Sequence, residues 1–253
     1  MTHIENSKFS IITVVYNGEK YLQGTIDSVR AQSFSDFEYL IIDGNSKDAT
    51  CEIIKANTDV VSFWMSEPDK GLYDAMNKGL AHSKSDFVFF LNCGDHLFDK
   101  DTLSNISRCI DVETDIVYGD TMYVNDTREQ LGIRSQNTNH KLPKNLNANS
   151  FKFGMSVSHQ AIFVRQSIAS SFIENNLASD IDWVISALEK SRKNVNANII
   201  VSEFLVGGIS KQKHKQSLID RYHVLKKHYG FISNIFNHGV IILRTVLKSI
   251  KAN

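Results

Sequence analysis

The period of hydrophobic and polar positions changes several times along the first hundred residues. Four runs are almost continuously apolar and rich in β-branched or aromatic residues: FSIITVVY (9–16), FEYLIIDG (37–44), VVSFWM (60–65) and DFVFFLN (86–92). Between them, residues 19–31, 48–56 and 72–81 place apolar side chains three and four positions apart, as a helix does. Apolar strands that alternate with helices predict an α/β fold, in which a mostly parallel sheet has helices on both faces.

The alternation becomes less regular after residue 100. We expect a helix over 101–110, strands over 115–124, 159–165 and 195–204, and helices over 180–191 and from 215 to the end. The stretch 128–150 is rich in Asn and poor in apolar residues, which predicts a loop or a partly ordered lid. The chain therefore divides into an α/β domain over residues 1–210 and a helical C-terminal region over residues 211–253.

Composition narrows the classes of protein that fit this pattern. The 28 Lys and Arg residues balance 28 Asp and Glu residues in a chain of 253, so the bulk charge does not favour nucleic acid as a partner. The cysteines at 51, 93 and 109 form no CxxC pair, which argues against a zinc site and favours a reducing cytoplasm. The polar N-terminus and the absence of a long apolar run predict neither a signal peptide nor a membrane-spanning helix.

Polar residues stand where the predicted parallel strands end, which is the edge where such sheets bind ligands. The first strand runs into Asn17, the second ends in Asp43, and the fourth runs into the turn NCGD (92–95). Asp43 suits contact with a ribose hydroxyl or a base N–H, although capping of the next helix explains it equally well.

The sequence has no glycine-rich loop that would cradle a phosphate, since neither GxGxxG nor GxxxxGK[ST] occurs. A divalent cation, Mn²⁺ or Mg²⁺, would replace the cradle, because such ions bridge phosphate oxygens with few protein ligands. Asp95 is placed to hold it, and Gly94 permits a sharp turn and the close approach of a ligand. Considered alone, Asp95 is more simply explained as a turn residue.

The chain resembles bacterial family 2 glycosyltransferases of the GT-A nucleotide-sugar fold over two successive blocks, FSIITVVYNGEKYLQGTIDSVRAQSFSDFEYLIIDGNSKDAT and SEPDKGLYDAMNKGLAHSKSDFVFFLNCGD. The resemblance covers about residues 8–100, weakens through 115–150, and returns at SVSHQAIFVR, ASDIDWVISAL and FLVGGIS. It implies a GT-A-like domain over residues 1–210 with a C-terminal helical appendage.

The resemblance also implies a role for each matching residue. Contact with the nucleotide-sugar is implied for Thr13, Val15, Asn17, Asp43, Asp69, Lys70, Gly71, Asn77, Asn92, Gly94, His159 and Gln160. Asp95 matches the metal-ligating acid of the family's D-x-D type motif, whose earlier acids are replaced here by Asn92, Cys93 and Gly94. The catalytic base is matched best by Asp180, with Asp182 as the alternative, although both acids also suit the first turn of a helix.

The implied function is an inverting transfer of a hexose from a nucleoside diphosphate donor, most simply a UDP-sugar. The acceptor would be a hydroxyl of a glycan or lipid-linked oligosaccharide in cell-surface polysaccharide synthesis. Two alternatives remain at this point. A sugar nucleotidyltransferase would carry a glycine-rich, basic loop where Tyr16-Asn17-Gly18-Glu19 stands, and a catalytically weak partner subunit of a glycosyltransferase complex would fit the reduced NCGD motif.

The C-terminal stretch HGVIILRTVLKSIKAN mixes apolar residues with Arg244, Lys248 and Lys251. It is too short to span a bilayer, whereas a basic amphipathic helix fits an anionic membrane surface. Packing against the domain or a partner, including a second copy in a homodimer, fits equally well. Gly207-Gly208 indicates a tight turn or a loop that closes over phosphate. We therefore expect a cytoplasmic protein with a peripheral contact to the inner face of the cell membrane.

Overall fold

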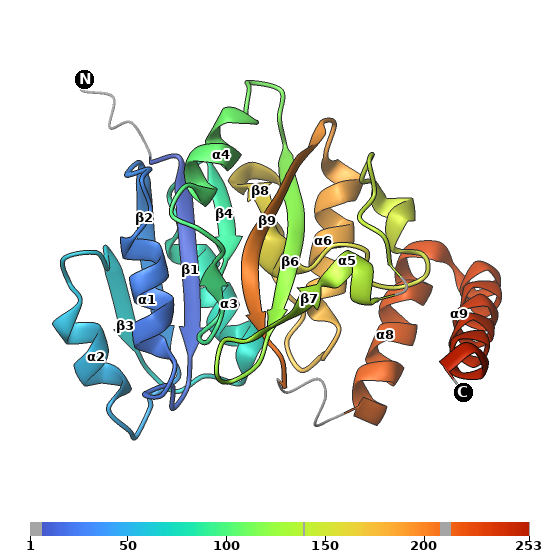
Figure 1. The fold of residues 1–253 in the computed structure, drawn as a ribbon, viewed down its shortest axis with the longest axis horizontal. Helices are drawn as coiled ribbons and strands as arrows, with labels where there is room; N and C mark the ends of the chain where they lie inside the picture. The colour runs from blue at the N-terminus through green and yellow to red at the C-terminus, as the bar shows by residue number, and fades with distance from the viewer. Residues whose placement is uncertain (1–6, 139, 208–213, 253) are drawn as a thin grey trace.

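The protein is built around one mixed sheet with helices on both faces (Figure 1), and the computed structural model describes residues 7–138, 140–207 and 214–252. The strands are β1 (Phe9–Val15), β2 (Phe37–Asp43), β3 (Phe63–Ser66), β4 (Phe87–Phe90), β5 (His96–Leu97), β6 (Ile116–Val124), β7 (Gln130–Ile133), β8 (Ile162–Arg165) and β9 (Asn194–Leu205). The helices are α1 (Leu22–Arg30), α2 (Thr50–Ala56), α3 (Leu72–His82), α4 (Thr102–Arg108), α5 (Arg134–Asn137), α6 (Ser179–Lys190), α8 (His214–Tyr229) and α9 (Phe231–Ala252). Short 3₁₀ helices are η1 (Ala148–Phe151), η2 (His159–Ala161) and η3 (Gln166–Ile168).

The strands lie in the order β3-β2-β1-β4-β8-β6-β9-β5, and β7 pairs with β6 beside this path. β1 is parallel to β2 and β4, and β2 is parallel to β3. β8 is antiparallel to both β4 and β6, while β6 and β9 are parallel to each other. The predicted parallel sheet is therefore confirmed for the first four long strands, and β8 reverses direction within it.

The predicted apolar faces of the helices pack against this sheet. α1 buries Leu22, Ile26 and Val29. In α3, a Cβ at Gly79 would lie only 2.4 Å from the Ile12 side chain, so the glycine lets the helix approach β1 closely. Leu72 was expected on the buried face of α3, but it is partly exposed because it lies at the first position of the helix.

Two predicted segments differ from the structure. Residues 159–161 form η2 rather than the start of a strand, so β8 begins only at Ile162. The stretch 128–150, expected as a loop or lid, contains β7, α5 and η1, and β7 adds to the sheet. The sequence did not reveal these elements because each is only four residues long.

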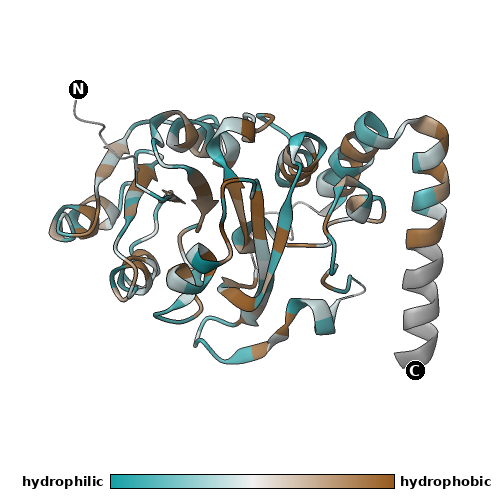
Figure 2. Cartoon of the chain, turned by 90° about the horizontal axis from the view of Figure 1, so that it is seen from above, coloured by the Kyte–Doolittle hydropathy of each residue, from teal (hydrophilic) through white to brown (hydrophobic). Residues whose placement is uncertain are grey.

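The C-terminal region is helical, as expected, and divides at Gly230 into α8 and α9. α8 packs against α6, and it buries Val224 and Leu225 in the same core as the sheet. α9 stands at the edge of the molecule, farther from the sheet (Figures 1 and 2). Within the described ranges no helix is both long and apolar enough for a membrane crossing. The predicted loop at Gly207-Gly208 lies partly outside the described residues.

Candidate functional site

The parallel strands β1, β2 and β4 end at one edge of the sheet, the lower edge in Figure 1. The N-terminus of α6, where Asp180 lies, is at the same edge. Segments that are far apart in sequence therefore meet there, as the strand pattern predicted. In open α/β sheets this edge is where ligands bind.

The loops after β1 and β2 are joined to each other by Asn17. Its backbone adopts a positive φ of 51°, and its N–H donates to Ser46 Oγ at 2.7 Å. In return, the N–H of Lys47 donates to Asn17 Oδ1 at 2.9 Å. Val15, also predicted to line the nucleotide pocket, accepts from the N–H of Gly44 through its carbonyl at 2.9 Å. These bonds make a preorganised rim, in which the Asn17 side chain has a structural role.

Asp43 is fully buried at the end of β2, and its carboxylate is already engaged. It accepts from the Ser46 N–H at 3.0 Å and from the hydroxyls of Ser46 and Ser66, the latter at 2.5 Å. The Cys51 thiol also lies 3.5 Å from Oδ2. The carboxylate therefore shapes the turn after β2, which is the structural alternative weighed for it, and its contact with a nucleoside stays a prediction.

Thr13 was predicted to line the nucleotide pocket, and its side chain is fully buried in the structure. Its hydroxyl lies 2.7 Å from the Leu91 carbonyl oxygen, to which it donates, and 3.0 Å from Tyr39 Oη. It links β1 to the segment after β4, and its contact with a nucleotide stays a prediction.

Asp69, Lys70 and Gly71 precede α3 and lie at the rim of the same edge. Asp69 accepts from the Gly71 N–H at 2.9 Å, and a Cβ at Gly44 would lie 2.4 Å from its Oδ2. Gly71 has a φ of 121°, which favours glycine. Lys70 is exposed and lies 3.8 Å from Glu174.

Tyr16 was not among the predicted site residues, yet it belongs to this rim. Its side chain is 63% exposed at the end of β1. A Cβ at Gly44 would lie 3.4 Å from its ring, so Tyr16 and Asp69 flank the same glycine. The strand alternation gave the only sequence signal, since it places Tyr16 on the face opposite to Val15.

Asn77 was predicted to lie beside the donor phosphates, and its amide is instead bonded to the backbone. Nδ2 donates to the Phe172 carbonyl at 3.0 Å, while Oδ1 accepts from the Phe172 N–H at 2.7 Å. The pair fixes α3 to the segment before α6. Asn77 therefore holds that segment in place, and its contact with the donor stays a prediction.

Three residues from three separate segments form a polar chain at the end of β4. Asn92 Nδ2 lies 3.4 Å from His159 Nε2, and His159 Nδ1 lies 3.3 Å from Asp180 Oδ2. Nε2 is thus within hydrogen-bond distance of Asn92, whereas Nδ1 is within ion-pair distance of Asp180 and makes no hydrogen bond. The Asp180 carboxylate accepts from the Ile181 N–H at 2.9 Å through Oδ1 and remains partly open to solvent.

Tyr73 also lies beside Asp180, although its helix was expected only to pack against the sheet. Burial, together with the adjacent Asp180 carboxylate, raises the pKa of the Tyr73 hydroxyl well above its ordinary value. Its ring stacks on Phe172 at 5.6 Å, which keeps it in place. A neutral phenol beside Asp180 is therefore part of the site.

Asp95 is buried in the turn that follows β4. Its Oδ1 accepts from the Leu205 N–H at 2.9 Å, and its Oδ2 accepts from Gln160 Nε2 at 3.3 Å. Burial raises the pKa of Asp95 to about 7, despite these donors. Gly94 has a φ of 99°, and a Cβ there would lie 3.1 Å from Leu205, so the turn requires glycine.

The oxygen atoms of this turn suit a cation that arrives with a diphosphate. Asn92 Oδ1 is buried and has no hydrogen-bond partner, and Asp95 supplies carboxylate oxygens; both are hard ligands that Mg²⁺ or Mn²⁺ accepts. Among the described residues there is no group of three or more His, Cys, Asp or Glu side chains that could hold a metal ion. The turn therefore offers a partial set of ligands, and the remainder would come from phosphate and water.

Asp182, the alternative candidate for the base, lies in a different environment. Its Oδ1 is 2.7 Å from Lys227 Nζ and 2.9 Å from His228 Nε2, both on α8. Burial would raise the pKa of Asp182, but the hydrogen bonds from His228 and Lys227 outweigh this effect and lower it. Asp182 therefore anchors α8 to α6, and only Asp180 faces the polar chain with His159.

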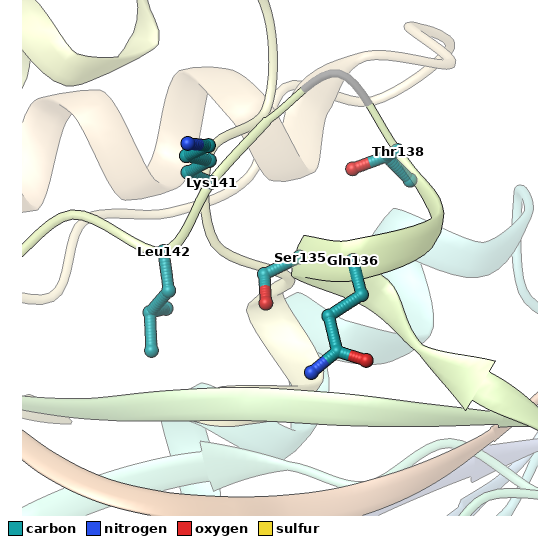
Figure 3. A pocket seen from close by; sticks show the side chains of 5 residues that line it. All are labelled: Ser135, Gln136, Thr138, Lys141 and Leu142. Carbon is teal, nitrogen blue, oxygen red and sulfur yellow. The ribbon is translucent and has the colours of Figure 1, made fainter.

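A separate hollow of about 620 Å³ lies within the stretch 128–150 (Figure 3). Its lining side chains are Ser135, Gln136, Thr138, Lys141 and Leu142. None of them was singled out from the sequence, where the stretch offered only its polar composition. The stretch 128–150 therefore lines a cavity and is not a simple extended loop.

Solved structures of other proteins share the fold of this chain. S. aureus TarS in complex with UDP-GlcNAc matches with a TM-score of 0.68 and 16% identity, over 92% of this chain and 70% of that chain. The mannosyltransferase PcManGT from Pyrobaculum calidifontis, in complex with GDP-Man and Mn²⁺, matches with a TM-score of 0.67 and 13% identity, over 98% and 76%. The fold is therefore GT-A-like, with a mixed sheet and added C-terminal helices.

The sequence comparisons identify the family. The model of glycosyl transferase family 2 matches residues 10–172, which is more than half of the chain. A PGL/p-HBAD biosynthesis glycosyltransferase of Mycobacterium bovis is 30% identical over 182 residues, which is 69% of this chain and just under two thirds, 66%, of that relative. An uncharacterized glycosyltransferase of Mycobacterium tuberculosis is 38% identical over 96 residues, covering 38% of this chain and 37% of its own. The chain belongs to glycosyl transferase family 2.

Proposed function

We propose that this protein is a glycosyltransferase that moves a sugar from a nucleoside diphosphate donor to a hydroxyl of a glycan or lipid-linked oligosaccharide, with inversion at the anomeric carbon. The observation that carries the proposal is the Asp180 carboxylate, which lies beside His159 at the ligand edge of the sheet and is partly open to solvent. UDP is the nucleotide we favour, and the complex of TarS with UDP-GlcNAc supports it. The complex of PcManGT with GDP-Man makes GDP the second candidate.

The proposed chemistry uses Asp180 as the general base. Its carboxylate removes the proton from the acceptor hydroxyl, and the acceptor oxygen forms a bond to the anomeric carbon. The bond from that carbon to the donor diphosphate breaks on the opposite face, and the electron pair leaves with the nucleoside diphosphate. His159 is proposed as a positioning residue, because its Nδ1 lies 3.3 Å from Asp180 Oδ2.

A divalent cation, Mn²⁺ or Mg²⁺, remains part of the proposal, and the Mn²⁺ in the PcManGT complex supports it. Asp95 and Asn92 would contribute oxygen ligands, and the ion when bound would offset negative charge on the diphosphate. We expect Asp95→Ala to lower UDP affinity when Mn²⁺ is present and to change it little when EDTA is present. Isothermal titration calorimetry measures both; an unchanged affinity in Mn²⁺ would remove Asp95 from this role.

The role of the base is tested by a matched pair of substitutions on one helix. Asp180→Asn should retain donor binding and lose about 10²- to 10⁴-fold in transfer, because the amide cannot accept the proton. Asp182→Asn should retain turnover per folded molecule and lose stability instead, because it faces Lys227 and His228. The measurement is transfer and hydrolysis with UDP-, GDP- and dTDP-sugars. Full turnover of Asp180→Asn would exclude Asp180 as the base.

The same assay distinguishes the two alternative functions that the sequence left open. Family membership supports a glycosyltransferase over a sugar nucleotidyltransferase. A catalytically weak partner subunit would bind a nucleotide-sugar yet neither transfer nor hydrolyse it with any donor. An accessible carboxylate beside His159 supports an active enzyme over such a subunit.

A further inference from the structure

The helix α9 buries polar side chains and exposes apolar ones. Asn234 and Asn237 face the protein and are only 0% and 3% exposed. Ile232 and Phe236 point outward and are 84% and 70% exposed. A helix that only packed on its own domain would bury its apolar side and expose its amides.

The contact between α8 and α9 includes polar and aromatic groups. Asn234 Nδ2 donates to the Tyr222 carbonyl at 3.1 Å, and the ring of His238 lies 5.1 Å from the ring of Tyr222. Four apolar side chains near the start of α9 remain exposed beside this contact.

This apolar side forms a continuous surface, which we call the α9 face. It consists of Phe231, Ile232, Ile235 and Phe236, all of them more than half exposed. Their spacing of three, four and five positions places them together on one side of the helix. Figure 2 shows that α9 stands at the outer edge of the molecule, where a flat surface can reach it. Clusters of large exposed apolar side chains mark interaction sites.

The charge of the surrounding sequence indicates what this partner is. After Asp220 the chain contains Arg221, Lys226, Lys227, Arg244, Lys248 and Lys251, and it contains no acidic residue. The chain as a whole is neutral, so this last segment is locally basic. An anionic surface is attracted to such a segment, whereas two copies would bring like charges together.

We propose that the α9 face lies on an anionic lipid surface. The apolar side chains enter the boundary between headgroups and acyl chains, and the net basic charge of the segment attracts anionic headgroups. The helix lies in the plane of the surface, since none of the helices in residues 7–138, 140–207 and 214–252 could cross a membrane. The proposal rests on α9 and is independent of the transfer chemistry.

The test uses the full chain and vesicles of phosphatidylcholine, either pure or containing about a third of phosphatidylglycerol, a typical anionic lipid. We expect the protein to cosediment with the anionic vesicles and to dissociate as salt is added. The double variant Ile232→Ser/Phe236→Ser should bind at least about tenfold more weakly, because two apolar side chains no longer enter the lipid. The control Val112→Ser changes a 91% exposed apolar residue outside α9 and should bind like the unchanged protein.

Two results would overturn the proposal. One is equal binding of the double variant and the unchanged protein to anionic vesicles. The other is a dimer in sedimentation velocity that the double variant abolishes, in a protein that binds no vesicles, which would make the α9 face a contact between copies. Transfer in solution should be the same for the double variant, so failure here is distinct from failure of the proposed catalysis.

Discussion

Hydrogen-bond partners separate the polar residues that can meet a ligand from those that hold the fold. Thr13 and Asn77 have their side chains engaged with backbone groups of other segments. Asp180 differs, because its carboxylate faces an imidazole and remains partly open to solvent. A buried polar group that loses its partner costs more free energy than an exposed one, so substitutions at the two kinds of residue should have different consequences.

Substitution of Thr13 tests this distinction. Thr13→Val keeps the shape of the side chain but leaves the Leu91 carbonyl and Tyr39 hydroxyl without this partner. We expect the free energy of unfolding to fall by about 1–3 kcal/mol while the KM for the donor stays the same. Urea denaturation and donor kinetics measure the two quantities. Thr127→Val, at an exposed turn, is the control and should change stability by less than about 0.5 kcal/mol. A raised KM with unchanged stability would return Thr13 to the nucleotide pocket.

At the scale of elements, α8 holds the helix that carries the candidate base. Its Asp220 accepts from the Leu177 N–H at 2.8 Å, just before α6 begins. Its His228 lies 2.9 Å from both Asp182 and Glu189 of α6. The position of Asp180 therefore depends on contacts made from the opposite side of its own helix.

The contact of His228 should make stability depend on pH. Burial lowers the pKa of His228, but hydrogen bonds to Asp182 and Glu189 outweigh burial and raise it above its ordinary value. Since the folded pKa is the higher one, the stabilisation is complete below the unfolded pKa and is lost as pH rises through the folded pKa. Hence His228→Gln should cost more stability at pH 6 than at pH 9.

Denaturation with urea at the two pH values measures that difference. His223→Gln provides the comparison, because His223 is an exposed histidine on the same helix. The comparison variant should follow the pH profile of the unchanged protein. A cost of His228→Gln that is equal at both pH values would show that the ion pairs do not contribute.

At the scale of the whole molecule, the last two helices differ in how they pack. α8 is part of the core through Val224 and Leu225, and Tyr229 donates to the Ala148 carbonyl. α9 exposes its apolar side instead. The boundary near residue 210 stays a prediction, and the helix that follows it, α8, shares the core of the α/β domain. A cytoplasmic location stays a prediction from the sequence.

Truncation distinguishes these two helices. A chain that ends at residue 230 should still unfold cooperatively, whereas one that ends at residue 213 should lose cooperative folding. The second truncation uncovers core residues and leaves Asp182 buried without its cationic partners, which costs about 3–5 kcal/mol for a broken buried pair. Circular dichroism during thermal unfolding measures both chains. Cooperative unfolding of the shorter chain would establish residues 1–213 as an independent domain.

The alternation of apolar and polar positions determined much of this protein by itself. It gave the long strands, the buried sides of α1 and α3, and the edge at which the site lies, because these follow from local period and from the geometry of parallel strands. The resemblance to the family, and not the alternation, implied that NCGD departs from the acidic motif. The alternation did not predict the short elements between residues 128 and 150, because four residues are too few to establish a period.

Only the tertiary structure decided which polar residues belong to the site. Asp180 and Asp182 are two positions apart, so they point to different sides of α6, and the segments packed on each side determine their roles. Asp43 and Asn77 match family positions in sequence, yet Ser66 and Phe172 engage their side chains. These partners lie 23 and 95 residues away along the chain. Long-range contacts of this kind have no signature in local sequence, and they determine whether a polar group is free to react.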